Sequence, residues 1–225
     1  LFAYPPFKNV SRSGRWPSSS ESQNINFLYP PWFLAYSAAL LEREKIEVGL
    51  LDATAEEMDD ESFVKYVEKK NPELLVVETS TITINPDLSL MKRIKDEVGC
   101  KIALSGPHVT ALTSEIMKEN PFIDFILVGE YELTALELAQ KLKFESKYYR
   151  ILGLAFRSDG KVKINERRPL INDLDFLPFP ARRMLRMDRY NEAFAKFPSQ
   201  QMITSRGCPF QCVFCLWPQT LFGRF

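Results

Sequence analysis

Three cysteines lie close together near the end of the chain, and their spacing suits metal binding. Cys208, Cys212 and Cys215 form the pattern C-x3-C-x2-C. Three thiolates on one short loop can bind three irons of a [4Fe–4S] cluster and leave the fourth iron open to a small molecule. A secreted disulfide framework would instead distribute its cysteines through the fold. We therefore expect these three cysteines to be cluster ligands.

A zinc site is the alternative for the same three residues. Structural zinc usually has four protein ligands, and the single histidine of the chain, His108, is far from the cysteines in sequence. The ligand number therefore favours the cluster. The remaining cysteine, Cys100, lies at an expected helix–strand turn, and we expect it to be a structural thiol.

A regular alternation of strand and helix patterns precedes the cysteine loop. Helical patterns separate five short, almost continuously apolar runs, which is typical of strands buried on both faces of a parallel sheet. The alternation predicts an α/β fold with a doubly wound, parallel five-stranded sheet. The expected strands are 1–4, 46–51, 74–79, 101–105 and 123–128, and the expected helices are 30–43, one beginning at Asp59 or Asp60, 86–98, 113–119 and 131–142.

Ligands of such sheets bind beyond the carboxyl ends of the strands. The expected loops there carry small and hydroxylated residues, which let a bulky ligand approach the backbone and can bond its amides or phosphate. No G-x-G-x-x-G motif follows a strand, so a dinucleotide site is not indicated. The candidate binding residues are Pro5, Thr79, Ser80, Thr81, Ser105, Gly106, His108, Gly129 and Glu130.

The pattern changes after about residue 145. Two short strands, 151–157 and 161–165, are expected to form a hairpin around Ser158-Asp159-Gly160. A proline-containing connector with an arginine cluster follows, and a fresh strand over 201–205 leads into the cysteine loop. We divide the chain into 1–145, a hairpin and connector over 146–198, and the start of another domain over 199–225. We expect it to be a piece of a longer protein, and the serine-rich segment 11–22 to be a mobile loop.

The cysteine pattern, preceded by Ser205-Arg206-Gly207, resembles the radical S-adenosylmethionine (SAM) enzymes. The resemblance implies that residues 199–225 begin a (β/α) barrel and that Phe214 lies near the adenine of SAM. It also implies that the open iron binds the amino and carboxylate groups of SAM. One electron from the cluster would then cleave SAM to methionine and a 5′-deoxyadenosyl radical.

With this motif in the same chain, residues 1–145 resemble the flavodoxin- or Rossmann-like cobalamin-binding domain of the B12-dependent radical SAM enzymes. In this sequence Ser105 and Tyr131 stand where glycine is usual or frequent, and both would narrow the pocket. The chain has no D-x-H-x-x-G motif, so the resemblance implies cobalt without a protein histidine. His108 would line the pocket of the dimethylbenzimidazole tail, or would simply be a strand-end histidine bonded to backbone. The segments that carry the resemblance are Tyr4-Pro5-Pro6, Glu78-Thr79-Ser80-Thr81, Ser105–Thr110 and Val128–Glu132.

The resemblance implies a C-methyltransferase. The radical would abstract hydrogen from an unactivated carbon, and methylcobalamin close to that carbon would donate the methyl group. The alternatives are radical chemistry on carbon skeletons without methyl transfer, a corrinoid-binding module without catalysis, and an electron-transfer protein. We expect residues 1–225 alone to be inactive. The segments Phe214–Thr220 and Tyr29–Trp32 resemble the branch acting on hopanoid-type lipids, so the expected substrate is a small molecule or a lipid.

The charge balance limits the partners. The chain has 29 Lys and Arg against 29 Asp and Glu, which lacks the basic excess of a dedicated nucleic-acid binder. No apolar run approaches the roughly 20 residues of a membrane span, and the first residues show no signal-peptide pattern. We expect a cytoplasmic protein that takes electrons from a donor such as flavodoxin or ferredoxin.

Overall fold

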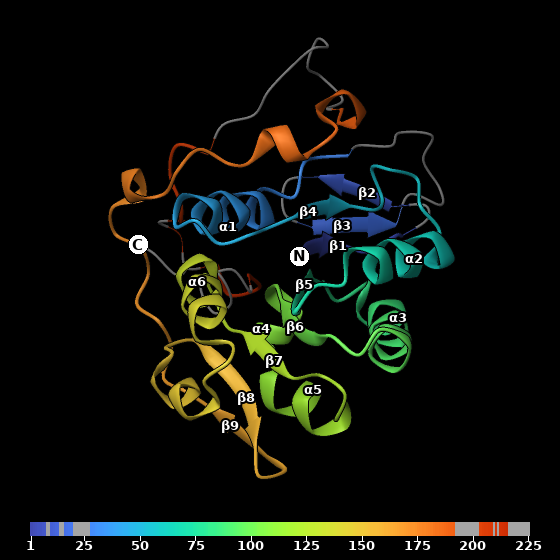
Figure 1. Cartoon of the computed structure of the whole chain (residues 1–225). Coiled ribbons are helices and arrows are strands. Elements are labelled where there is room, and N and C mark those ends of the chain that lie inside the picture. The colour runs from blue at the N-terminus through green and yellow to red at the C-terminus, as the bar shows by residue number, and fades with distance from the viewer. Residues whose placement is uncertain are drawn as a thin grey trace.

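The computed structural model of the chain describes residues 1–7, 10–13, 16–19, 28–191, 203–208, 210 and 212–215. Its main feature is one seven-stranded sheet with helices on both faces (Figure 1). Five neighbouring strands are parallel, which confirms the predicted α/β fold. In their order across the sheet these are β4 (Leu50–Asp52), β1 (Phe2–Tyr4), β5 (Leu74–Glu78), β6 (Lys101–Ser105) and β7 (Phe125–Leu127).

The order of the parallel strands gives the sheet a switch point. Taken in chain order, the five strands lie as 2-1-3-4-5, which is the arrangement of flavodoxin-like sheets. Phe2 of β1 is paired with Leu50 on one side and with Val76 on the other. The chain therefore runs from β1 to β4 on one side and then crosses over to β5 on the other side. The carboxyl ends of β1 and β5 flank the place where such folds bind ligands.

The strands are apolar on both sides because each face of the sheet is covered by helices (Figure 1). Val76 packs into the core shared with α1 (Trp32–Arg43) and α6 (Glu132–Lys141). Leu75 and Val77 point the other way, into the core shared with α2 (Asp60–Lys70), α3 (Ile84–Glu97) and α5 (Thr113–Glu119). Each parallel strand therefore lacks a solvent-facing side, as its sequence predicted.

The helix boundaries follow local signals in most places. The side chain of Asp59 accepts a hydrogen bond from the Ser62 amide at 2.8 Å, which confirms the predicted N-cap of α2. Helix α3 begins at Ile84, before the expected Pro86, because proline is tolerated in the first turn of a helix. A short helix, α4 (Pro107–Ala111), occupies a segment that we expected to be a loop.

The predicted hairpin is confirmed, and it belongs to the main sheet. Strands β8 (Leu154–Ser158) and β9 (Lys161–Ile164) flank Asp159 and Gly160, whose φ values of 51° and 70° are those of a tight hairpin turn. Strand β8 pairs antiparallel with β7. The expected five-stranded sheet is therefore extended to seven, because both faces of β8 carry apolar side chains that join the two cores.

Two further strands lie where the serine-rich composition predicted a loop. β2 (Val10–Ser13) and β3 (Trp16–Ser19) form a separate antiparallel pair. Serine favours turns through local side-chain hydrogen bonds, but this preference does not prevent backbone pairing between two adjacent short segments.

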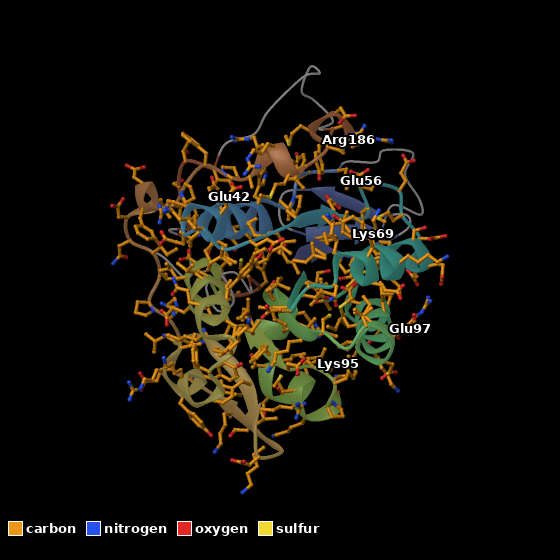
Figure 2. The ribbon with its side chains drawn as sticks, viewed as in Figure 1. Glu42, Glu56, Lys69, Lys95, Glu97 and Arg186 are labelled. Carbon is orange, nitrogen blue, oxygen red and sulfur yellow. The ribbon has the colours of Figure 1, made fainter. Side chains whose placement is uncertain are left out.

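The connector after β9 is held against α1 and the β4–α2 loop. It contains the short 3₁₀ turns Leu174–Phe176, Arg182–Met184 and Met187–Arg189. Arg186 and Glu56, which are both labelled in Figure 2, form an ion pair with a separation of 3.9 Å, and Arg183 pairs with Glu42. These exposed pairs add little stability. The buried hydrogen bond from the Tyr190 hydroxyl to Asp52, at 2.9 Å, fixes the end of the connector more firmly.

Residues 203–208 are described without regular secondary structure, and residues 201 and 202 of the expected last strand lie outside the described ranges. The start of a barrel over 199–225 therefore stays a prediction. Within the described ranges, no helix has both the length and the apolar character needed to cross a bilayer.

Candidate functional site at the carboxyl edge of the sheet

The carboxyl ends of the parallel strands bring the predicted binding residues to one edge. The Thr79 amide donates to the Ser105 carbonyl at 3.0 Å, which joins the ends of β5 and β6. The Gly129 amide donates to the Thr110 hydroxyl at 3.1 Å, which joins the end of β7 to α4. Buried Pro5 follows β1, and its carbonyl accepts a hydrogen bond from Thr54. Hydrogen bonds therefore hold several neighbouring segments of this edge together.

The loop after β5 is held by a buried polar network. The Thr79 hydroxyl donates to Asp87 Oδ2 at 2.6 Å and lies 3.2 Å from the Thr83 hydroxyl. The Ser80 amide donates to the same Thr83 hydroxyl at 3.0 Å. Thr79 and Ser80, both predicted to bind the ligand, thus use their polar groups inside the protein and fix the shape of the loop.

Asp87 is the ionisable centre of this network. It is only 2% exposed, and burial raises the pKa of its carboxyl from 3.8 to about 7. The hydrogen bonds from Thr79 and Thr83 act in the opposite direction, because they stabilise the carboxylate. The protonation state of this carboxyl therefore changes close to neutral pH.

Gly106 is required by the approach of two backbone segments. Its φ is +108°, and a Cβ atom at this position would lie 2.2 Å from the Thr79 carbonyl oxygen. We expected this glycine to give room to a ligand. The structure instead shows that it gives room to the neighbouring strand end.

Thr81 and His108 are the predicted polar side chains that reach the surface of this edge. Thr81 is exposed and His108 is half-buried. The two are joined by a 3.1 Å hydrogen bond between the Thr81 hydroxyl and His108 Nδ1. Burial lowers the pKa of His108 below its ordinary value, which favours a neutral imidazole. Together they offer a hydroxyl and a neutral ring to a ligand.

Ser105 and Tyr131, which both replace an expected glycine, lie beside the same carboxylate. The Tyr131 hydroxyl donates to Glu78 Oε2 at 2.5 Å. Burial, followed by the charge of Glu78, raises the pKa of Tyr131 well above its usual range, and the Ser105 hydroxyl also bonds the phenol. The two side chains therefore fill space beneath the edge between β5, β6 and α6.

Glu130 was expected to contact the ligand, but its carboxylate is engaged within the protein. It lies 3.7 Å from the Arg206 guanidinium and accepts a hydrogen bond from the Ile171 amide at 2.9 Å. Glu132, the first residue of α6, lies 2.6 Å from the same guanidinium. A buried charge cluster thus connects the turn after β7 to the residue that precedes Gly207 and Cys208.

The cysteine loop presents three free thiols. Cys208 and Cys215 are half-buried and Cys212 is exposed. The Cys215 amide donates to the Cys212 carbonyl at 3.0 Å, which forms a turn between these two cysteines, and Phe214 is 89% exposed. Among the described residues, no three His, Cys, Asp or Glu side chains already converge on one point. The donor set fits iron–sulfur chemistry by its three thiols on one short loop.

Comparison with known protein families identifies the domain that contains the sheet. The sequence profile of the B12 binding domain matches residues 23–139. The chain belongs to the B12-binding domain family. The matched range includes the ends of β5, β6 and β7, so this part of the carboxyl edge lies within the match, whereas β1 and Pro5 precede it. The predicted resemblance to cobalamin-binding proteins is confirmed.

Relatives and solved structures agree with this assignment. The B12-binding chain is 35% identical to an uncharacterized methyltransferase of Pyrococcus horikoshii, over 83% of this chain and 40% of the relative. It is 27% identical to the anaerobic magnesium-protoporphyrin IX monomethyl ester cyclase of Rubrivivax gelatinosus, over 83% of this chain and 35% of the relative. The chain thus spans less than half the length of these curated relatives.

The fold is also that of the cobalamin-dependent S-adenosylmethionine radical enzyme OxsB, solved with aqua-cobalamin and S-adenosylmethionine bound. The TM-score is 0.65 at 15% identity, and the match covers 80% of this chain and 23% of OxsB. At this identity the comparison establishes a shared fold.

Sequence reasoning missed the buried polar residues that support the edge. Asp87 lies at the start of the predicted helix 86–98, and a carboxylate among the apolar positions of α3 is a signal of an internal partner. Glu132 and Arg206 lie in the predicted motifs, but their contact joins positions 74 residues apart, which no local pattern indicates.

Proposed function

We propose that the chain is the cobalamin-binding and cluster-binding part of a radical SAM enzyme, of which methyl transfer is the expected reaction. The observation that carries the proposal is the presence, in one chain, of a B12-binding sheet and a loop with three free thiols in the C-x3-C-x2-C pattern. The first offers a corrinoid site, and the second offers an incomplete ligand set for a [4Fe–4S] cluster. Neither alone would specify this combination.

The corrinoid site is proposed at the carboxyl edge, between the ends of β1 and β7. Thr81 and His108 would offer hydrogen bonds to the ligand, and Pro5, Gly106 and Gly129 would form its backbone wall. Thr79, Ser80 and Ser105 would support this surface through their internal hydrogen bonds, and Glu130 through its contact with Arg206. Cobalamin, when bound, supplies a transferable methyl group.

The cluster site is proposed at Cys208, Cys212 and Cys215. These thiolates would hold three irons, and Phe214, whose ring is exposed, would lie against the adenine of SAM. The cluster, when bound, supplies the electron that cleaves SAM. An external donor such as flavodoxin or ferredoxin would deliver that electron, and the reaction is proposed to take place in the cytoplasm.

The names of the relatives support methyl transfer, and one of them also supports an alternative reaction. One relative is a methyltransferase of unassigned substrate, and another is a cyclase. The cyclase favours radical chemistry on a carbon skeleton without methyl transfer as the second candidate. A corrinoid-binding module without catalysis would require that the three thiols bind no cluster.

The substrate is proposed to be a small molecule or a lipid with an unactivated carbon. Most of the segment that resembles the hopanoid-lipid branch, residues 216–220, lies outside the described ranges. Trp32, from the aromatic patch of the same resemblance, is buried, and the Arg182 guanidinium lies 5.3 Å from its ring centroid. This tryptophan therefore belongs to the packing between α1 and the connector.

Anaerobic reconstitution tests the proposal. We expect the protein, incubated with iron, sulfide and hydroxocobalamin, to bind one oxygen-sensitive [4Fe–4S] cluster and one corrinoid per chain. Replacement of Cys208, Cys212 and Cys215 by alanine should abolish iron binding and leave the corrinoid bound. Cys100→Ala is the matched control and should retain both. Equal iron content in the triple variant and the wild type would contradict the cluster assignment. Failure of the wild type to bind corrinoid would contradict the proposed corrinoid site.

Transfer of an isotopically labelled methyl group from SAM distinguishes methyl transfer from the alternatives. In the full-length enzyme, labelled methylcobalamin should form from reduced corrinoid. A catalytically competent enzyme that forms 5′-deoxyadenosine but never labels its corrinoid would favour the chemistry without methyl transfer.

A further inference from the structure

Arg206 is a buried charge that stands two residues before Cys208 in sequence and against the B12-binding sheet in space. Its side chain is 2% exposed, and its guanidinium lies 2.6 Å from Glu132 Oε1 and 3.7 Å from Glu130 Oε1. Both glutamate side chains are almost fully buried and belong to the segment that joins β7 to α6. The cysteine loop and the carboxyl edge are thus connected by charged groups.

Aromatic rings enclose Arg206 on its other side. The centre of its guanidinium lies 5.3 Å from the ring centroids of Phe33 and Tyr36, both in α1. A planar guanidinium stacks well on aromatic faces, and the attraction strengthens when water is excluded. Arg206 is therefore buried between helix α1 and the segment that joins β7 to α6. Its departure would leave two carboxylates buried without this cation.

The backbone changes direction immediately after this buried residue. Gly207 has a φ of +101°, a left-handed conformation that glycine adopts without strain. The chain then continues to Cys208, which is half-buried, and to Cys212, which is exposed. The loop therefore leaves a fixed point inside the B12-binding domain and reaches the surface within a few residues.

We propose that Arg206 is a positioning residue, which fixes the cysteine loop against the corrinoid edge and thereby sets the distance between the iron–sulfur cluster and the corrinoid. The anchoring of the loop stands on the contacts above, whereas its consequence for the two cofactors rests on the proposed function. Spacing is important for such a pair, because a misplacement of about 1 Å between reacting groups can lower a rate by about 100-fold.

The charge count of the cluster allows stability to be separated from positioning. The wild-type set has one cation and two carboxylates, a net charge of −1, and Arg206→Met changes it to −2. Combining Arg206→Met with Glu132→Gln restores −1 without restoring the anchor. Arg168→Met is the matched control, because Arg168 pairs with Glu137 at the same 2.6 Å distance and lies elsewhere in the domain.

The first measurement needs no cofactor. Nitroxide labels are attached, through a ketone-bearing amino acid, at the exposed positions 161 in β9 and 213 in the cysteine loop, and their distance distribution is recorded by pulsed electron paramagnetic resonance. We expect a narrow distribution in the wild type, and one at least twice as wide in Arg206→Met. The Arg206→Met/Glu132→Gln variant should recover most of the thermal midpoint and keep the wide distribution. Arg168→Met should lower the thermal midpoint and keep the narrow distance distribution. A wild-type width in the double variant would overturn the proposal.

The second measurement uses the reconstituted protein. The magnetic coupling between the reduced cluster and bound cob(II)alamin should be uniform in the wild type and spread over a range of distances in the double variant, with unchanged iron content. An unchanged coupling in a variant with a wide nitroxide distribution would overturn the link to the cofactors. If the wild type binds no cluster or corrinoid, the proposed function fails, and the nitroxide result still decides whether Arg206 anchors the loop.

Discussion

The Thr79 hydroxyl and the Asp87 carboxyl are joined by a buried hydrogen bond of 2.6 Å, which ties the loop after β5 to the first turn of α3. The loop that follows the strand is the one that carries Thr81 to the surface of the carboxyl edge. Its shape therefore depends on a carboxyl group that is buried beneath the surface of this edge. This dependence makes the site sensitive to pH and to conservative substitution beneath it.

Asp87 should make the protein less stable as the pH rises. Its pKa is about 7 in the folded chain against an ordinary value of 3.8, so the folded chain binds more protons than the unfolded chain between these values. The free energy of unfolding should then fall from about pH 4 to about pH 7, by on the order of 4 kcal/mol. Asp87→Asn should flatten this part of the profile, as measured by urea unfolding at a series of pH values.

Asp188→Asn provides the control for that experiment. Asp188 is exposed, and its hydrogen bond with Arg186 lowers the pKa of its carboxyl. Its removal should leave the fall between pH 5 and pH 7 intact. A wild-type slope in Asp87→Asn would show that the buried carboxyl does not govern the profile.

Gly106→Ala should destabilise the protein severely. The added Cβ would lie 2.2 Å from the Thr79 carbonyl oxygen, so the ends of β5 and β6 must separate. We expect a loss of about 3 kcal/mol or more in urea unfolding, beyond the roughly 1–2 kcal/mol for a left-handed alanine. Gly99→Ala isolates that smaller part, because Gly99 has a φ of +77° and open space around it. Equal losses in the two variants would contradict the steric argument. A large residue at position 106 consequently cannot serve as a test of ligand binding in an intact fold.

Tyr131→Phe should weaken the same edge from below. The variant keeps the ring but removes the hydrogen bond to Glu78, whose charged acceptor then loses a buried partner. We expect a loss of about 2 kcal/mol in unfolding free energy, together with weaker corrinoid binding. Tyr149→Phe removes a hydroxyl from a half-exposed ring and should change stability by less than about 0.5 kcal/mol. An unchanged free energy of unfolding in Tyr131→Phe would show that Glu78 accepts a hydrogen bond from another donor.

Bound cob(II)alamin should carry no axial nitrogen from the protein. The chain lacks D-x-H-x-x-G, and the single histidine uses Nδ1 to bond Thr81 at the edge. Electron paramagnetic resonance should therefore show no nitrogen superhyperfine splitting from an axial ligand. His108→Ala should leave the spectrum unchanged and weaken corrinoid binding. A splitting that is present in the wild type and absent in His108→Ala would identify this histidine as a cobalt ligand.

The features predicted from sequence are those that local patterns encode. The first four residues of β5, Leu74–Val77, indicate burial on both faces because all of them are apolar. Asp59 indicates the start of a helix because its carboxylate can reach the amide three residues later. The turn at Asp159 and Gly160 is equally local. Each of these was found without knowledge of the partner elements.

The features that were missed depend on tertiary pairing. Nothing near Arg206 in sequence indicates that its charge is buried between Phe33 and Glu132, since both partners lie in the first 140 residues. The hydrogen bond between Asp87 and Thr79 is a similar case, because it joins helix α3 to the loop after β5. In both cases the sequence indicated that the strand ends share one edge of the sheet, but the internal hydrogen bonds and ion pairs that shape this edge required the structure.

The two outer strands of the sheet affect how one copy of this protein meets another. Strand β7 is apolar throughout, and a free edge of that kind would recruit strands from other chains. The sheet ends instead in β9, whose Lys161 and Lys163 carry charge at the rim, and in β4, which is only three residues long. Lysine and short length both discourage strand addition. The hairpin after β7 thus shields the edge of this apolar strand from intermolecular β-pairing.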